Sequence, residues 1–376
     1  LTEEDYRGER FKNHKSELKG NNELLSITQP EIIKDVHRAF LKAGADIIES
    51  NTFSANSISQ KDYDLSDYVK ELNVQSVKIA KEVAEEYSTP EKPRFVAASI
   101  GPTNKTASIS PDVMNPAYRD VTFDELVATY KEQVEILADC DVDIFLIETI
   151  FDTLNAKAAI YAIKQVLQEK NKNIPIMLSV TLSDKSGRTL SGQTLEACYY
   201  SVEFANPLSI GLNCSLGIKD MIPYIEELGT YTKFRISLYA NAGLPNAFGE
   251  YEQTPEMMAE GYRELAQKGL LNICGGCCGT TPEHINAIYN AVKDITPHKI
   301  SNIENYQSYS GLEPFVYNGN QNFVMVAERT NVTGSKKFAR LVNEHKFDEA
   351  LEIAREQIEN GANIIDINMD SDLSNS

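Results

Sequence analysis

The chain has 376 residues, of which 42% are hydrophobic and 24% charged, a balance that excludes disordered, collagen-like and fibrous proteins. Its 55 Asp and Glu exceed its 36 Lys and Arg, and the net charge of −19 disfavours binding to nucleic acid or to an anionic membrane surface. No segment has the roughly 20 apolar residues of a membrane span, and residues 1–10 show no secretion signal, so we expect a cytoplasmic protein without membrane association.

Short apolar segments with strand character alternate with helical segments through the first 295 residues. Two of the helical segments have a capping box at their start, Thr28 with Glu31 and Thr122 with Glu125. The alternation is typical of a parallel sheet, because parallel neighbours need a long crossover connection and a helix supplies it. The seven predicted strands span residues 45–50, 94–100, 143–149, 175–182, 208–214, 233–241 and 271–277.

The first clear element, residues 30–43, is a helix, so the alternating pattern begins half a unit late. Seven strands and one upstream strand would make eight, which predicts an α/β fold of the (β/α)₈ (TIM) barrel type that lacks its first strand. Such barrels usually have about 250 residues or more, in agreement with a first domain of residues 1–295. The alternative is an open doubly wound sheet, although no Gly-x-Gly-x-x-Gly motif follows the first predicted strand.

Residues 296–322 are polar, rich in Pro and Gly, and without periodicity, which predicts a linker. Residues 323–327 then form a predicted strand, residues 347–359 a helix and residues 363–368 another strand. This order predicts that residues 323–376 begin a second (β/α)₈ barrel that is truncated after about two units. We therefore expect a fragment of a longer protein.

Three of the six cysteines are expected at the ends of predicted strands. Counting the missing strand, Cys214 ends the sixth strand, and Cys277 and Cys278 end the eighth. Active sites of barrels lie at the C-terminal strand ends, and alternate strands direct inward side chains into shared layers, so the three sulfurs can meet around one point. Three thiolates with one exchangeable position are typical of a catalytic zinc site, because structural sites usually have four protein ligands.

Other interpretations of the cysteines stay open from the residues alone. A lone cysteine is most often a small buried apolar residue, which we expect for Cys140 and Cys198 in predicted helices. Cys274 and Cys277 form a C-x-x-C pair, typical of a redox site or of half a zinc ribbon, but the second pair of a ribbon is missing. The glycines that flank Cys277 and Cys278 permit the backbone dihedrals needed to direct both sulfurs toward one ion.

The segments GLNC at residues 211–214 and GGCCG at residues 275–279 resemble the zinc-binding signature of the homocysteine S-methyltransferase family. The resemblance covers the whole first domain, although the Asp-Gly-x-Met-Gly motif of the family's first strand is absent. Further segments are similar to the cobalamin-dependent methionine synthase branch in particular. They are GPTN at 101–104, TASISP at 106–111, FDTLNAK at 151–157, SGRTLSGQ at 186–193 and NAGLPN at 241–246.

For the first domain, the resemblance implies homocysteine as substrate and Zn²⁺ bound by Cys214, Cys277 and Cys278, with the substrate thiol in the fourth position. A thiol with a pKa of about 8.5 is little ionised at neutral pH, and coordination would keep it as the nucleophilic thiolate. Asn241, at the end of the seventh strand, would hold the fourth position when substrate is absent. Its alternative role is that of a turn residue before Ala-Gly.

Acidic and amide side chains are also expected at this end of the barrel. Glu148 ends the fourth strand, and the resemblance implies that it pairs with the ammonium group of homocysteine. Its alternative role is a helix cap or a solvated carboxylate beside Thr149. Glu49 and Asn51, at the end of another strand, are expected to face the same mouth without an assigned contact.

In the second domain, four residues resemble those of the opening two strands of a pterin-binding barrel: Glu328, Asn331, Asp366 and Asn368. Asp366 and Asn368 lie two positions apart and so share one strand face, as groups that bind the polar edge of a pterin should. The alternative is that they close a strand-to-helix turn. The resemblance implies 5-methyltetrahydrofolate as co-substrate.

Together these resemblances imply a methyltransferase of the 5-methyltetrahydrofolate-homocysteine S-methyltransferase type. The methyl group would pass from methylfolate to cobalamin, which is bound by a module of the same full-length protein outside this chain segment. Methylcobalamin would then methylate homocysteine to give methionine. The alternatives are a homocysteine methyltransferase dependent on betaine or S-methylmethionine, and a scaffold in which zinc is only structural.

Overall fold

The computed structural model describes residues 1–246, 248–300, 303–304 and 306–370. The chain divides into two compact units, Leu1–Phe315 and Val316–Ser376, which are treated separately. Among the described residues, no helix combines the length and the apolar character needed to cross a membrane.

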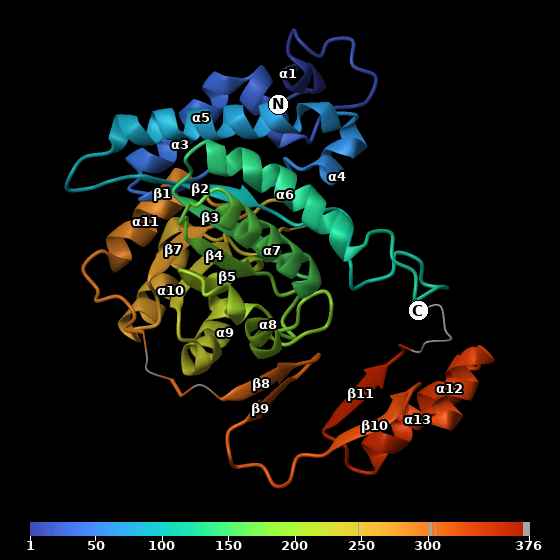
Figure 1. Ribbon diagram of the computed structural model, residues 1–376. Coiled ribbons are helices and arrows are strands. Elements are labelled where there is room, and N and C mark those ends of the chain that lie inside the picture. Colours follow the sequence, from blue (N-terminus) through green and yellow to red (C-terminus); the bar gives the residue numbers. More distant parts are fainter. Residues whose placement is uncertain (247, 301–302, 305, 371–376) are drawn as a thin grey trace. The chain divides into compact units, whose positions relative to one another are not determined.

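The first unit contains one parallel sheet whose seven strands follow one another in chain order. The sheet is curled, β1 and β7 are its edge strands within the described residues, and helices cover its outer face (Figure 1). This is a TIM-barrel-like α/β fold with seven parallel strands, as predicted. The strands are β1 (Ile47–Glu49), β2 (Phe95–Ile100), β3 (Ile144–Ile150), β4 (Ile176–Val180), β5 (Ser209–Gly217), β6 (Arg235–Asn241) and β7 (Ile273–Gly276).

The helices of this unit are α1 (Glu3–Arg7), α2 (Leu25–Thr28), α3 (Pro30–Lys42), α4 (Ser57–Gln60), α5 (Val69–Tyr87), α6 (Phe123–Asp139), α7 (Thr153–Glu169), α8 (Leu195–Val202), α9 (Ile218–Tyr231), α10 (Pro255–Gln267) and α11 (Pro282–Val292). The predicted capping box of α6 is confirmed, since Thr122 and Glu125 each accept a hydrogen bond from the other's backbone N–H. The predicted box at Thr28 is wrong. Thr28 ends α2, and α3 begins at Pro30, whose fixed φ suits the first helical position.

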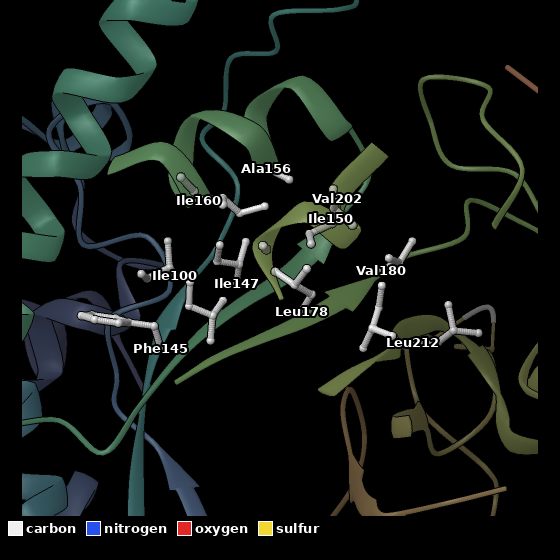
Figure 2. Packing of buried hydrophobic residues seen from close by; sticks show 14 of the residues in the cluster. Ile100, Phe145, Ile147, Ile150, Ala156, Ile160, Leu178, Val180, Val202 and Leu212 are labelled. Carbon is white, nitrogen blue, oxygen red and sulfur yellow. The ribbon is translucent and has the colours of Figure 1, made fainter. Parts of the chain in front are cut away.

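Side chains along each strand alternate between the outer face, beneath the helices, and the interior of the barrel. On β3, Phe145 and Ile147 belong to the outer core, whereas Ile144 and Leu146 belong to an interior cluster. Figure 2 shows the outer layer, in which Ile147 lies on the same side of the sheet as Ile160 of α7. Because both faces are buried, the strands have nearly continuous apolar sequences.

The interior rows of side chains change from apolar to polar toward the C-terminal ends of the strands. On β1, Ile47 is followed on the same face by Glu49, and on β3, Leu146 is followed by Glu148. On β2, between them, Ala97 pairs with Glu49, and Ser99 follows it on the same face. The fold therefore brings polar groups from neighbouring strands together at the C-terminal end of the barrel.

The segment predicted as a linker, residues 296–322, contains a hairpin of two short strands, β8 (Gln307–Ser310) and β9 (Pro314–Tyr317). Its turn is held against the preceding unit by side-chain and backbone bonds. The Gln193 Nε2 amide donates to the Gly311 carbonyl at 2.9 Å, and further bonds join residues 194 and 201 to the hairpin. Part of this segment thus belongs to the folded first unit.

The described residues of the second unit from Val326 onward form two parallel strands and two helices. The helix expected over 347–359 is confirmed, because α13 has these bounds. The first strand differs from the prediction, since β10 starts at Val326 and continues through Asn331. It extends further because Thr330 and Asn331 still pair with β11 beyond a register shift. The elements are β10 (Val326–Asn331), α12 (Lys336–Asn343), α13 (Phe347–Glu359) and β11 (Ile364–Asn368).

Candidate metal centre and substrate cavity

Three cysteine sulfurs meet at the C-terminal end of the barrel. Cys214 lies in β5, and Cys277 and Cys278 directly follow β7. The Sγ atom of Cys278 lies 3.5 Å from that of Cys214 and 3.9 Å from that of Cys277, and all three Sγ atoms lie within 4.8 Å of one another. Tetrahedral zinc with bonds of about 2.3 Å to sulfur places its ligands about 3.8 Å apart. The three side chains therefore have the spacing of ligands to one such ion.

An unusual backbone conformation directs Cys214 toward this point. Cys214 and Ser215 have φ values of 62° and 64°, in the left-handed region that disfavours residues with a side chain. Each such residue costs about 1–2 kcal/mol relative to the right-handed conformation. The pairing of β5 with β6 is interrupted over the same residues, between Asn213 and Gly217. The strand thus departs from regular geometry where its sulfur is needed.

Asn213, the residue before Cys214, is fixed by the neighbouring strands. Its Oδ1 accepts hydrogen bonds from the Ser179 hydroxyl at 2.7 Å and from the Thr149 backbone N–H at 3.0 Å. Its Nδ2 donates to the Thr149 hydroxyl at 3.0 Å. Thr149 also has a positive φ, of 57°. This buried network anchors the strained turn that carries Cys214.

The segment after β7 is held by backbone contacts with β6. The Cys277 N–H donates to the Ala240 carbonyl at 2.9 Å, and the Cys278 N–H donates to Asn241 Oδ1 at 3.0 Å. Gly279 has a φ of 77°, and a Cβ there would lie 2.3 Å from the Tyr251 ring. The position therefore requires glycine, which lets the chain turn away from the sheet directly after the two cysteines.

The three thiols influence one another's protonation. The hydrogen bonds that Cys278 receives from the Cys214 and Cys277 thiols lower the pKa of Cys278. The same contacts raise the pKa of Cys277, since its thiol is the donor, and burial adds to the increase. Three thiolates at this separation repel one another, so full ionisation of the cluster calls for a cation. A divalent ion that binds thiolate supplies that charge.

The remaining cysteines do not join this cluster. Cys198 is fully buried in the core, as expected for a small apolar residue, and Cys140 follows α6. Cys274 lies on β7, where burial raises the pKa of its thiol to about 12. Three or more His, Cys, Asp or Glu side chains could hold one metal ion if their ligand atoms lie close together. Among the described residues, Cys214, Cys277 and Cys278 form such a group.

A cavity of about 660 Å³ lies in the barrel interior beside the sulfurs. Cys277 and Thr280 line it at one place, and Glu49, Glu148 and Tyr239 line it from the strands. The side chains of α3 and α11 complete its wall between β1 and β7. Sulfur and carboxylate groups from distant parts of the sequence thus face one shared space.

Glu148 is nearly buried in this cavity, with 8% of its surface exposed. Its Oε1 accepts a hydrogen bond of 2.5 Å from the Ser99 hydroxyl. Burial raises the pKa of Glu148 well above its usual range, and the nearby carboxylate of Glu49 raises it further. Glu49 is an exposed residue, but the protein atoms around its carboxyl group raise its pKa to about 7 through partial desolvation.

The two remaining residues predicted near the mouth have different surroundings. Asn241 is buried next to the sulfurs, where its Oδ1 is bonded to the Cys278 N–H. Asn51 turns away, since its Nδ2 donates to the Asn22 carbonyl at 2.7 Å and to Ser26 Oγ at 3.1 Å. The structure thus brings Asn241 to the metal centre and uses Asn51 to hold the segment around α2.

Comparison with known proteins agrees with this geometry. The family model described as homocysteine S-methyltransferase matches residues 2–292. The chain belongs to the homocysteine S-methyltransferase family. A second model, described as pterin binding enzyme, matches residues 327–375. This methyltransferase therefore combines a homocysteine S-methyltransferase domain with residues of a pterin-binding domain.

Solved structures share the fold of the methyltransferase domain. The metallated form of the homocysteine methyltransferase MmuM from Escherichia coli is 23% identical, with a TM-score of 0.57 over 71% of this chain and 86% of that one. Its apo form is 22% identical, with a TM-score of 0.54 over 73% of this chain and 90% of that one. At this identity the likeness concerns the barrel fold alone.

In the pterin-binding part, two of the four predicted residues are in direct contact. Asn331 Nδ2 donates to Asp366 Oδ2 at 3.2 Å, and both side chains are half-buried. Asn368 Oδ1 instead accepts from the Asp370 N–H at 2.9 Å, as in a turn after a strand. Glu328 is exposed. The structure therefore pairs the side chain of Asn331 with that of Asp366. The side chain of Asn368, the last residue of β11, instead binds the backbone that follows the strand.

Tyr239 is one of several polar cavity residues that are missing from the set predicted by sequence. Tyr239 lies on β6, is 9% exposed and packs in the interior cluster with Leu146. Burial raises the pKa of its hydroxyl, and the charge of Glu49 contributes. The alternation along β6, where Leu238 and Ala240 face outward, is the signal that could have placed Tyr239 inside.

Proposed function

We propose that this chain transfers a methyl group to the sulfur of L-homocysteine, giving methionine, with Zn²⁺ held by Cys214, Cys277 and Cys278. The observation that carries the proposal is the approach of three sulfurs within 4.8 Å, although Cys214 and Cys278 are 64 positions apart in the sequence. Family membership supports homocysteine as the methyl acceptor.

The metal would supply a Lewis acid that lowers the pKa of an incoming thiol, which is about 8.5 for free cysteine, so that the thiolate is available at neutral pH. The chain provides three sulfur ligands and leaves a position for the substrate. Asn241 is the neutral oxygen donor beside Cys278, and we assign it to that position in the absence of substrate. The strained turn at Cys214 and the contacts after β7 hold the sulfurs in place before substrate binds.

Glu148 is assigned to the ammonium group of homocysteine. A carboxylate at the wall of the same cavity as Cys277 can accept charge-assisted hydrogen bonds from that group while the substrate sulfur lies at the cysteines. Ser99 keeps the carboxyl of Glu148 in one orientation through the bond to Oε1. These contacts hold one substrate at both of its ends, which favours a reactive orientation.

For the methyl donor we assign methylcobalamin, bound by a module outside this segment, with 5-methyltetrahydrofolate as the methyl source. The match of residues 327–375 to a pterin-binding model supports the folate part. Within those residues we assign pterin binding to Asn331 and Asp366, whose side chains lie in contact with each other, with Glu328 and Asn368 as further candidates. We assign residues 1–295 to the homocysteine barrel, 296–322 to a linker and 323–376 to the start of the folate barrel.

The metal site is tested by X-ray absorption of the zinc-loaded chain, with and without L-homocysteine. We expect three sulfur neighbours and one nitrogen or oxygen neighbour without substrate, and four sulfur neighbours with it. Cys140→Ala serves as a control, since this cysteine lies outside the cluster. Four protein ligands that do not change with homocysteine would instead identify a structural zinc scaffold.

The donor is tested by supplying methylcobalamin, betaine or S-methylmethionine to the zinc-loaded chain with L-homocysteine. We expect methionine to form from methylcobalamin alone. Formation from betaine or S-methylmethionine, with none from methylcobalamin, would overturn the cobalamin assignment and leave homocysteine methylation intact.

A further inference from the structure

The proposed function gives no role to Glu49, the last residue of β1. Glu49 lies on the interior face of the barrel and lines the same cavity as Glu148 on β3. The two strands are separated by β2 alone, and its Ser99 donates a hydrogen bond to Glu148. The carboxyls are close enough that the charge of Glu49 raises the pKa of Glu148. Two acidic groups therefore share one wall of the cavity.

No positive charge compensates this pair within the described part of the cavity. Neither Glu49 nor Glu148 forms an ion pair, and no Lys or Arg is among the residues that line the cavity. Burial lowers the pKa of His37 on α3 to about 4, so its imidazole is neutral at pH 7. The other titratable side chains that line the cavity belong to tyrosine, cysteine and aspartate. They are Tyr239 on β6, Cys274 on β7, Cys277 after β7, Tyr289 on α11 and Asp46 before β1.

A residue that lines this space also has a buried polar atom without a partner. Glu148 is 8% exposed, and its Oε1 accepts the hydrogen bond from Ser99. His37 is equally buried, lines the same cavity, and has no partner for its Nε2. Unpaired buried polar groups cost stability and are usually satisfied by a ligand or water. The cavity therefore fits a ligand that carries hydrogen-bond donors and a positive charge.

We propose that Glu49 and Glu148 together bind the α-ammonium group of the amino-acid substrate, with Glu49 as the second carboxylate. This proposal rests on the proposed function, because it places the substrate sulfur near Cys277 and the ammonium group near the two glutamates that line the same cavity. An ammonium group has three donors and no acceptor, so it can bond to two carboxylates at once. Glu49 and Glu148 would therefore favour an amino acid over the same carboxylic acid that lacks the amino group.

Protonation of the pair follows from the same arrangement. Although Glu49 is an exposed residue, the surrounding protein raises its pKa to about 7. Without ligand, the two carboxyls therefore retain protons near neutral pH. A bound ammonium group stabilises both ionised forms and lowers their pKa values, so ligand binding releases protons to solvent.

The test compares Glu49→Gln with the wild-type chain, both loaded with zinc, by isothermal titration calorimetry. The probes are L-homocysteine and 4-mercaptobutanoate, which has the same thiol and carboxylate but no ammonium group. We expect Glu49→Gln to weaken L-homocysteine binding by about 10-fold or more and to leave 4-mercaptobutanoate binding unchanged. Glu49→Asp, which keeps the charge, should retain most of the preference for the amine.

Controls separate this effect from loss of structure and from failure of the proposed function. Glu132→Gln, the same change at an exposed residue of α6, should bind both thiols as the wild type does. A thiol-free pair, L-methionine and 4-(methylthio)butanoate, tests ammonium recognition without sulfur coordination. If Glu49→Gln keeps the full preference for both amines, or weakens each amine and its acid analogue equally, the proposal is overturned. If Glu49 is needed to prefer L-methionine while homocysteine leaves the zinc environment unchanged, the ammonium site stands and the methyltransferase proposal fails.

Discussion

Two clusters of side chains at the C-terminal end of the barrel have different chemistry. In the sulfur cluster, Cys214, Cys277 and Cys278 bring soft sulfur donors within 4.8 Å of one another. In the acidic pair, Glu49 and Glu148 present carboxyls that lack a cationic partner among the described residues. In both clusters the ionised groups repel one another, so each is stabilised by a cation. The sulfurs favour a soft divalent ion, and the carboxylates favour an ammonium group. The comparison suggests how one substrate can be recognised at two separate sites of uncompensated negative charge, one through a metal ion and one through its ammonium group.

Removing one sulfur from the cysteine cluster should have the largest effect, on both zinc binding and methyl transfer. We expect Cys277→Ala to lower zinc affinity by at least about 100-fold and methyl transfer with it, because the remaining two sulfurs cannot replace the third ligand. Zinc content after dialysis and the rate of methionine formation measure this. Circular dichroism should show a folded variant, since Cys277 is only partly buried. Full zinc content together with full activity would contradict the assignment.

Removing a charge from the acidic pair should have a smaller effect that is confined to the amine. We expect Glu148→Gln to raise the KM for L-homocysteine about 10- to 100-fold, as the loss of a charge-assisted hydrogen bond would. Steady-state kinetics measure this, with Glu132→Gln as the matched control. The double variant Glu49→Gln/Glu148→Gln should raise the KM by less than the product of the two single increases, because both side chains bind the same group. Strict additivity would show that the two carboxyls act independently.

The smallest expected effect is a dependence of amino-acid affinity on pH, which comes from the acidic pair and not from the cysteine cluster. The folded pKa of Glu49 is raised to about 7, so protons occupy the pair below that pH and must leave when an ammonium group binds. We therefore expect L-methionine to bind up to about 10-fold more tightly at pH 8 than at pH 6. Calorimetry in two buffers of different ionisation enthalpy should also show proton release.

The acid analogue 4-(methylthio)butanoate provides the control, because it has no ammonium group to displace protons. Its affinity should lack this increase with pH, and Glu49→Gln should show a shallower increase for L-methionine than the wild type. Tighter L-methionine binding at pH 6 than at pH 8 would contradict the sign of the expected shift.

Much of the barrel could be predicted because its signals are local. β-branched segments between helical segments gave the seven strands, and Thr122 with Glu125 marked the start of α6. Thr28 showed the same pattern and failed, since Pro30 imposed a later helix start that a capping pattern alone does not reveal. The approach of Cys214 to Cys278 followed from the rule that strand ends meet at one mouth of a barrel.

The rest depends on contacts that no local pattern contains. The left-handed conformation of Cys214 and Ser215 is imposed by the network around Asn213, whose partners come from β3 and β4. The relation of Glu49 to Glu148 requires the order and curvature of the strands, although each residue alone could be placed at a strand end. The hairpin of β8 and β9 has strands of four residues each, and only β9 is apolar, so its hydrophobic pattern is too short to predict a strand pair. Hydrogen bonds to the barrel help to hold it.

The left-handed pair at Cys214 and Ser215 limits how this protein could be engineered for heat resistance. Glycine would relax the backbone at either position, but at Cys214 it would also delete the sulfur. Ser215 is thus the position of the pair where glycine can increase thermal stability without removing a sulfur ligand. Any active variant has to keep Cys214 and, with it, the backbone strain at that position.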